Sequence, residues 1–168
     1  MRVTWPTAVT RVPSTPSTDS TMRRTTSSWG VTPRDSIDAA CHDRGKPNVV
    51  AGCIALLAGG DADVALVRSL GGPQADWNLD HGPEHRYWLR VWGARGLLWA
   101  WDDAAIPAVI GALGDESWRV REMALKVIVR HRVDDALEAV TERADDPVPR
   151  VRAAAARALQ RLTAVDDP

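Results

Sequence analysis

A repeat of 31 residues constrains the fold of this chain more than any other feature. Three windows at this spacing read WLRVWGARGLL from Trp88, RVREMALKVIV from Arg119 and RVRAAAARALQ from Arg150. Similar residues recur in four columns: Arg90, Arg121 and Arg152; Leu89, Val120 and Val151; Gly93, Ala124 and Ala155; Leu97, Ile128 and Leu159. A shorter helix-like segment lies between successive windows. One helical pair cannot bury its apolar face alone, but stacked pairs bury it jointly. We therefore predict an all-α fold, an α/α superhelix of about three helical pairs.

The column of small residues indicates close helix packing. Gly93, Ala124 and Ala155 each follow by four residues an apolar residue of the same helix face. A side chain this small allows two helix axes to approach closely. The last window is rich in alanine, and we expect its helix to pack tightly on one side and to meet solvent on the other.

The helical repeats are expected to span residues 84–163. The pattern predicts helices over 84–101, from Asp102 or Asp103 to 113, from Asp115 or Ser117 to 131, and over 134–144. The dipeptide Asp146-Pro147 predicts the start of the last helix, with an N-cap followed by proline in the first helical position.

The N-terminal half of the chain divides into two parts. Residues 1–36 contain 15 Ser or Thr and only 2 acidic residues, with no apolar period, and this composition predicts a disordered tail. A transit peptide would give the same composition. So would a start codon assigned too far upstream, in which case Met22 is another candidate start. Residues 37–83 are expected to cap the array with short helices, of which one starts at Asp61 or Asp63, and with a loop over 71–83 that is rich in Gly and Pro.

The pattern resembles the HEAT repeat, in particular the short HEAT-like class that occurs in phycobilin lyases and many bacterial proteins. The resemblance is carried by Asp115 with Val120-Arg121 and Ala124, and by Asp146-Pro147 with Val151-Arg152 and Ala155. The first window lacks the leading Asp and has Gly93 in place of Ala. The resemblance covers residues 84–163 well and 49–83 weakly. It implies a HEAT-like solenoid in which the second helix of each pair lines the concave side.

The arginine column has a structural and a functional interpretation. The arginine of this column resembles the one that, in HEAT-like repeats, forms a structural ladder by bonding to the Asp that opens a helix. A guanidinium suits this role because it can contact a carboxylate at two points. We predict this structural ladder for Arg90, Arg121, Arg152, Asp115 and Asp146. The alternative is a phosphate-binding role for the arginines.

A second set of columns predicts a binding groove on one helix face. Residues 0, 7 and 11 positions into each window fall within a stripe about 40° wide on a helix. We predict that they bind a partner protein: Trp88, Arg95, Trp99, Arg119, Lys126, Arg130, Arg150, Arg157 and Arg161. Arg and Trp are prominent in interface hot spots, and an acidic segment of a partner would suit this stripe. The alternative is a solvated face, because residues 84–163 hold 13 Lys and Arg against 12 Asp and Glu.

The tryptophans allow the same two interpretations. The chain has 8 Trp and no Phe, so some indole rings must fill the core. We expect Trp92 to be mostly buried, and Trp88 and Trp99 to be the exposed pair. The alternative is that all of them belong to the core.

Charge and motif content argue against several other functions. The net charge is −1, no apolar run is long enough to span a bilayer, and Cys41 and Cys53 form no metal or redox motif. We expect reduced thiols, a cytoplasmic location, no cofactor and no membrane association. Asp80, His81, Glu84 and His85 are metal-ligand types, but Gly82-Pro83 interrupts them, and no metal site is predicted.

Enzymes of the HEAT-like class give further alternatives. The iron hydroxylase of the HEAT-like class holds its metal with His-Glu pairs, and this chain has no His-Glu dipeptide. Nothing indicates a bilin pocket, and no catalytic residue is predicted. The interpretation favoured by the sequence is a non-enzymatic module that binds another protein through its concave face. Nucleic-acid binding by the same groove and an enzyme or lyase subunit remain as alternatives, and no oligomeric state is predicted.

Overall fold

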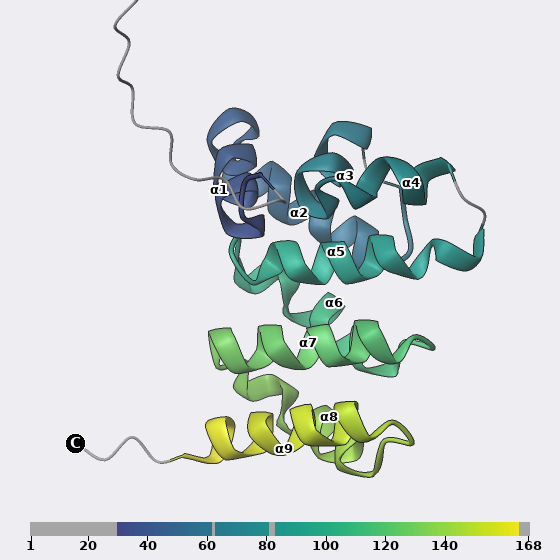
Figure 1. Ribbon diagram of the computed structural model, residues 1–168. Helices are drawn as coiled ribbons and strands as arrows, with labels where there is room; N and C mark the ends of the chain where they lie inside the picture. The colour runs from purple at the N-terminus through teal and green to yellow at the C-terminus, as the bar shows by residue number, and fades with distance from the viewer. Residues whose placement is uncertain (1–29, 62, 81–82, 165–168) are drawn as a thin grey trace, which may run out of the picture.

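The computed structural model describes residues 30–61, 63–80 and 83–164, and these residues form an all-α array (Figure 1). Nine α-helices lie in the described part of the chain: α1 Pro33–Arg44, α2 Lys46–Leu57, α3 Val64–Gly71, α4 Gln74–Asp80, α5 Tyr87–Leu97, α6 Ile106–Gly111, α7 Trp118–His131, α8 Leu137–Glu142 and α9 Pro149–Thr163. Short 3-10 helices adjoin several of them: η1 Pro83–His85, η2 Asp103–Ala105, η3 Ala112–Gly114, η4 Asp134–Ala136 and η5 Arg143–Asp145. The all-α, HEAT-like fold predicted from the repeat is confirmed.

The three long helices α5, α7 and α9 run nearly parallel in one layer, and the shorter α6 and α8 lie behind them (Figure 1). Helix α7 packs against both α5 and α9, and α2 packs against the other side of α5. The N-terminal helices α1–α4 gather at the α5 end of the stack (Figure 1). Each long helix therefore has a neighbour from the preceding unit, which is the arrangement that the repeat requires.

The small residues of the repeat lie where helices approach closely. Gly93 faces α2 so tightly that an added Cβ would lie 2.7 Å from the backbone oxygen of Cys53. Ala124 and Ala155 in the same column are fully buried. In α9 the buried positions are Val151, Ala154, Ala155 and Ala158, whereas Ala153 and Ala156 are exposed. The expected packed and solvent-facing sides of the alanine-rich helix are both present.

Several predicted boundaries need correction. The helix predicted over 84–101 is divided into η1 and α5, which ends at Leu97. The last helix starts at Pro149 with Val148 as its N-cap, not at Asp146-Pro147. Asp146 is not the cap because its carboxylate instead accepts hydrogen bonds from Val148 N–H and from an arginine of α7.

Two predictions for the N-terminal half also change. The segment 71–83, predicted as a loop, contains α4 and the first residue of η1. The predicted tail over 1–36 extends too far, because α1 starts at Pro33 and the Thr32 hydroxyl accepts the Asp35 N–H as its cap; residues 1–29 lie outside the described part. Asp63, one of the two predicted N-caps, caps α3 by accepting a hydrogen bond from the Leu66 N–H.

Candidate functional site

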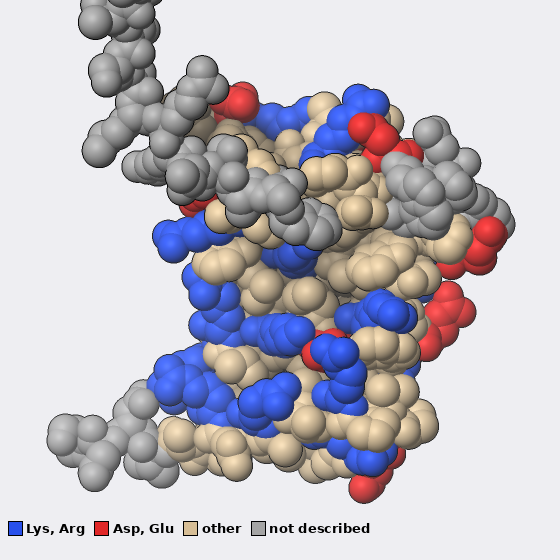
Figure 2. Space-filling view, viewed as in Figure 1, with Lys and Arg blue, Asp and Glu red and all other residues tan. Residues whose placement is uncertain are grey.

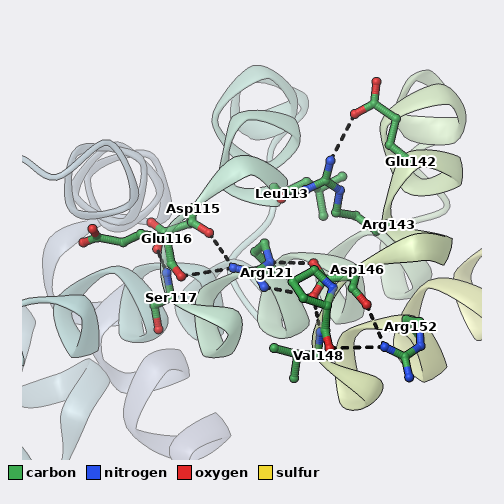
Figure 3. A network of polar contacts seen from close by, with 11 residues as sticks. Leu113, Asp115, Glu116, Ser117, Arg121, Glu142, Arg143, Asp146, Val148 and Arg152 are labelled. Carbon is green, nitrogen blue, oxygen red and sulfur yellow. Dashed lines mark hydrogen bonds and ion pairs between the residues drawn. The ribbon is translucent and has the colours of Figure 1, made fainter.

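A buried ion pair links the last two repeats. The Arg121 guanidinium of α7 donates two hydrogen bonds to the Asp146 carboxylate, from Nε at 2.8 Å and from Nη2 at 2.9 Å. Its Nη1 donates to the backbone oxygens of Asp115 and Glu116 in its own repeat (Figure 3). One side chain therefore ties the start of its own helix to the turn that precedes the next one.

The other two arginines of the column repeat part of this pattern. Arg90 donates from Nε to Asp115 at 2.6 Å and from Nη2 to Asp115 and Glu116. Arg152 donates from Nη1 to the backbone oxygens of Asp146 and Pro147, the same local contact that Arg121 makes (Figure 3). All three arginines of the column are thus engaged in contacts within the array.

The two aspartates of the ladder also order the local backbone. The Asp115 and Asp146 carboxylates accept the N–H of Ser117 and of Val148, each two residues further on. Burial acts to raise the pKa of Asp146, but the hydrogen bonds from Arg121 and Val148 outweigh it and hold that pKa below its usual value. The Asp146 carboxylate is therefore charged at neutral pH.

Arg143 adds a second link that sequence reasoning missed. Its Nη1 donates to the Leu113 backbone oxygen at 3.2 Å, and its Nη2 contacts the Glu142 carboxylate (Figure 3). This contact joins η5 to η3 of the preceding unit. An arginine outside the repeated columns gave no signal for it in the sequence.

Cationic side chains gather on the solvent-exposed side of α7 and α9. We call this surface the basic face and define it by Arg119, Lys126, Arg130, Arg150, Arg157 and Arg161. Figure 2 shows Lys and Arg spread over these two helices, with little Asp or Glu among them. All but the half-buried Arg119 are exposed. Six of the nine residues predicted from the three columns thus lie on this part of the surface.

One carboxylate interrupts the basic face. Glu122 is 12% exposed, and it lies 3.2 Å from Lys126 Nζ and 3.5 Å from an Arg150 nitrogen. Among the described residues, Arg130, Arg157 and Arg161 make no ion pair. The face therefore has more positive charge than its own carboxylates neutralise.

Indole rings hold several of these guanidinium groups in place. The Arg130 guanidinium lies 4.2 Å from the centre of the Trp99 ring, and Arg34 of α1 lies 5.4 Å from the same ring. The Trp118 ring has Arg119 at 4.4 Å and Arg150 at 5.2 Å. A stacked guanidinium uses its flat face for the ring and keeps in-plane N–H donors for other partners.

The exposure of the tryptophans agrees in part with prediction. Trp92 is 3% exposed and belongs to the core, as expected. Trp88 and Trp99 are not an exposed pair: both are half-buried and pack against the core. The Trp88 ring stacks on Trp92 at 6.4 Å and has the Arg119 guanidinium at 5.6 Å. These rings therefore support the basic face more than they offer bare aromatic surface.

Arg95 does not join the basic face, contrary to the prediction from its column. It is half-buried, and its Nη2 donates to the Leu70 backbone oxygen of α3 at 2.6 Å. Helix α3 packs against α5 here, where the later repeats have no equivalent neighbour. The guanidinium is drawn toward the N-terminal helices for this reason.

No metal centre is found in the described residues, where no group of three or more His, Cys, Asp or Glu could hold an ion. Of the metal-ligand types singled out, His81 lies outside the described residues. Cys41 and Cys53 are free thiols, and burial raises the pKa of Cys53 to about 12. Neither thiol has the lowered pKa of a reactive cysteine.

Comparison with known families supports the repeat. The family model described as HEAT repeats matches residues 85–160. Comparisons with curated proteins and with solved structures found no match. Residues 85–160 are thus similar to HEAT repeats, which generally mediate protein–protein interaction. No helix in the described parts of the chain is long and apolar enough to span a membrane.

Proposed function

We propose that this chain is a non-enzymatic module that binds another protein through the basic face of α7 and α9. The observation that carries the proposal is a set of exposed arginines with no carboxylate partner among the described residues: Arg130, Arg157 and Arg161. Arg130 and the neighbouring Arg119 also lie over indole rings. An acidic segment of a partner would supply the missing carboxylates. The similarity of residues 85–160 to HEAT repeats supports a protein partner.

Preorganisation favours binding at this face. A free arginine loses rotamer freedom when it binds, and this loss weakens association. The rings of Trp99 and Trp118 already restrict Arg130, Arg119 and Arg150. Each restricted guanidinium can donate to a carboxylate with less loss of entropy than a free one. Below the face, the Arg121–Asp146 pair links α7 to the turn that precedes α9.

Two finer features belong to the same proposal. The repeat period and the Asp, Val-Arg and Ala pattern support the short HEAT-like class, as in the phycobilin-lyase type. The free thiols Cys41 and Cys53 support a reducing, cytoplasmic location.

The test is partner capture with matched charge variants of the full chain. Arg157→Glu/Arg161→Glu reverses two exposed charges on α9. Arg68→Glu/Arg86→Glu is the control, since it changes the net charge equally at exposed positions of α3 and just before α5. Circular dichroism verifies that both variants remain helical. We expect the native chain and the control to capture the same protein and the α9 variant to lose it.

Capture that is equal for all three chains would contradict the proposal. Nucleic-acid binding by the same face is tested with a 20-base-pair duplex over a range of salt concentrations. Affinity that falls steeply with salt for the native chain, and is lost in the α9 variant, would favour that alternative over a protein partner.

A further inference from the structure

A cavity of about 650 Å³ lies at the N-terminal end of the array. Helices α1, α3 and α5 and the turn between α3 and α4 form its walls. It is lined by Val31, Pro33, Ser36, Ser69, Leu70, Gly71, Gly72, Pro73, Gln74, Trp88, Trp92 and Arg95. Its volume falls in the range of roughly 300–1,000 Å³ that is typical of small-molecule sites.

Among the described residues that line the cavity, Arg95 is the sole charged one. One of its terminal nitrogens donates to the Leu70 backbone oxygen, whereas its buried Nε has no hydrogen-bond partner among the described residues. No carboxylate contributes to the pKa of Arg95, which burial alone lowers. A guanidinium remains charged at neutral pH, so the cavity contains a positive charge that the described residues do not compensate.

The two serine hydroxyl groups of the lining already donate hydrogen bonds to backbone oxygens. Ser36 Oγ donates to the Ser69 backbone oxygen at 2.8 Å, and Ser69 Oγ donates to the Ala65 backbone oxygen at 3.0 Å. The Arg95 guanidinium is thus the charged group of the lining that still lacks an anionic partner among the described residues. Around it the walls are formed by indole rings, proline, leucine and glycine.

The charge and shape of the cavity define a class of ligand. A single guanidinium balances a single negative charge, and a dianion such as phosphate would leave charge uncompensated against apolar walls. A carboxylate can accept from the terminal N–H groups of a guanidinium. The half-buried ring of Trp88 offers surface to a flat apolar group, and Trp92 lines the cavity beside it.

We propose that this cavity binds a small organic monocarboxylate with a flat apolar body. Its carboxylate accepts hydrogen bonds from Arg95, and its body lies against Trp88 and Trp92. The proposal goes beyond protein binding at the basic face and does not depend on it, because Arg95 bonds to α3 and is not part of that face.

The test compares two isosteric probes on the full chain by isothermal titration calorimetry. The probes are 1-naphthylacetate and its neutral amide, 1-naphthaleneacetamide. We expect saturable one-to-one binding of the acid and at least about tenfold weaker binding of the amide, because hydrogen bonds to a charged group are lost. Chemical-shift changes of the Trp88 and Trp92 indole N–H signals should accompany binding of the acid.

Protein variants complete the test. Arg95→Leu should weaken binding of the acid at least about tenfold, and the control Arg68→Leu, outside the cavity lining, should leave it unchanged. If circular dichroism shows that Arg95→Leu is not folded, the comparison of acid and amide on the native chain decides. Equal affinity for acid and amide, or no saturation at millimolar acid, overturns the proposal.

A third probe separates a small molecule from a protein chain end with the same chemistry. This probe is an N-acetylated pentapeptide that ends in phenylalanine with a free carboxylate. We expect it to bind more weakly than 1-naphthylacetate. Tighter binding of the pentapeptide would overturn the assignment to a small molecule.

Discussion

The Arg121 guanidinium and the Asp146 carboxylate, 25 residues apart, form a two-point ion pair in which the side chains are 9% and 1% exposed. Each charge is out of contact with bulk water, so each depends on the other for compensation. The equivalent pair one repeat earlier, Arg90 with Asp115, is more exposed at 18% and 11%, and Arg90 also contacts Glu116. The two rungs of the ladder should therefore differ in their contribution to stability.

Removal of the buried carboxylate should destabilise the protein strongly. Asp146→Ala leaves the Arg121 charge buried, and we expect the free energy of unfolding to fall by about 3 kcal/mol, at the lower end for a broken buried pair. The lower end applies because Arg121 keeps two backbone acceptors. Urea unfolding monitored by circular dichroism measures the change.

The neighbouring exposed carboxylate provides the control for this experiment. Asp145→Ala should change the free energy of unfolding by less than about 0.5 kcal/mol. Asp115→Ala should give an intermediate loss of about 1–2 kcal/mol, since it removes a local N–H acceptor and a more exposed pair. Equal losses for Asp145→Ala and Asp146→Ala would show that the buried ion pair contributes no more to stability than an exposed carboxylate does.

A methyl group at Gly93 should disrupt the contact between α5 and α2. Its Cβ would lie 2.7 Å from the Cys53 backbone oxygen and 3.2 Å from the Leu57 backbone nitrogen, and neither atom can move without its helix. We expect Gly93→Ala to lower the free energy of unfolding by about 1–3 kcal/mol despite the better helix propensity of alanine.

Gly111 of α6 is the matched glycine for this comparison, because a Cβ there meets nothing within 4 Å. Gly111→Ala should be neutral or stabilise the protein by up to about 1 kcal/mol. Thermal unfolding of the two variants side by side measures the difference. The same sign for both would contradict close packing at Gly93.

His131 should make the stability depend on pH. Its ring stacks on Trp101 at 4.3 Å between ring centres, and its Nε2–H donates to the Leu97 backbone oxygen at 2.9 Å. Burial lowers the pKa of His131 below 6.5, and the charge of Arg130 adds to this, while the bond to Leu97 acts against it. The folded state therefore binds fewer protons than the unfolded state as the pH falls through this range.

The free energy of unfolding should accordingly fall when the pH is lowered from about 7.5 to about 5.5. His131→Gln keeps an N–H donor but does not titrate in this range. We expect the decrease to be smaller in this variant than in the native protein, as measured by urea unfolding at the two pH values. An identical decrease in both proteins would assign the pH dependence to other groups.

The sequence predicted the ladder because both partners recur at the repeat spacing. A column of arginines and a preceding aspartate in two repeats is a pattern visible without coordinates. The same reasoning misplaced the start of α9. It assigned Asp146 a local capping role, whereas Arg121 from another helix binds the carboxylate and the helix begins at Pro149.

Arg95 shows where the repeat could not guide prediction. Its column implied the same environment as Lys126 and Arg157, but the neighbour of α5 at that position is α3, which lies outside the repeat. Only the three-dimensional arrangement shows that Arg95 bonds to Leu70 and lines a cavity. The stacking of guanidinium groups on Trp99 and Trp118 likewise depends on rotamers that no spacing in the sequence determines.

The central claim is that α7 and α9 bind a partner protein through the basic face. Hydrogen–deuterium exchange of the full chain, with and without the captured partner, tests it most directly. Peptides from the turns that start α7 and α9 and from the exposed flanks of both helices should exchange more slowly in the complex, with α6 and α8 unchanged. Protection confined to α6 and α8, or to α1–α4, would contradict the claim.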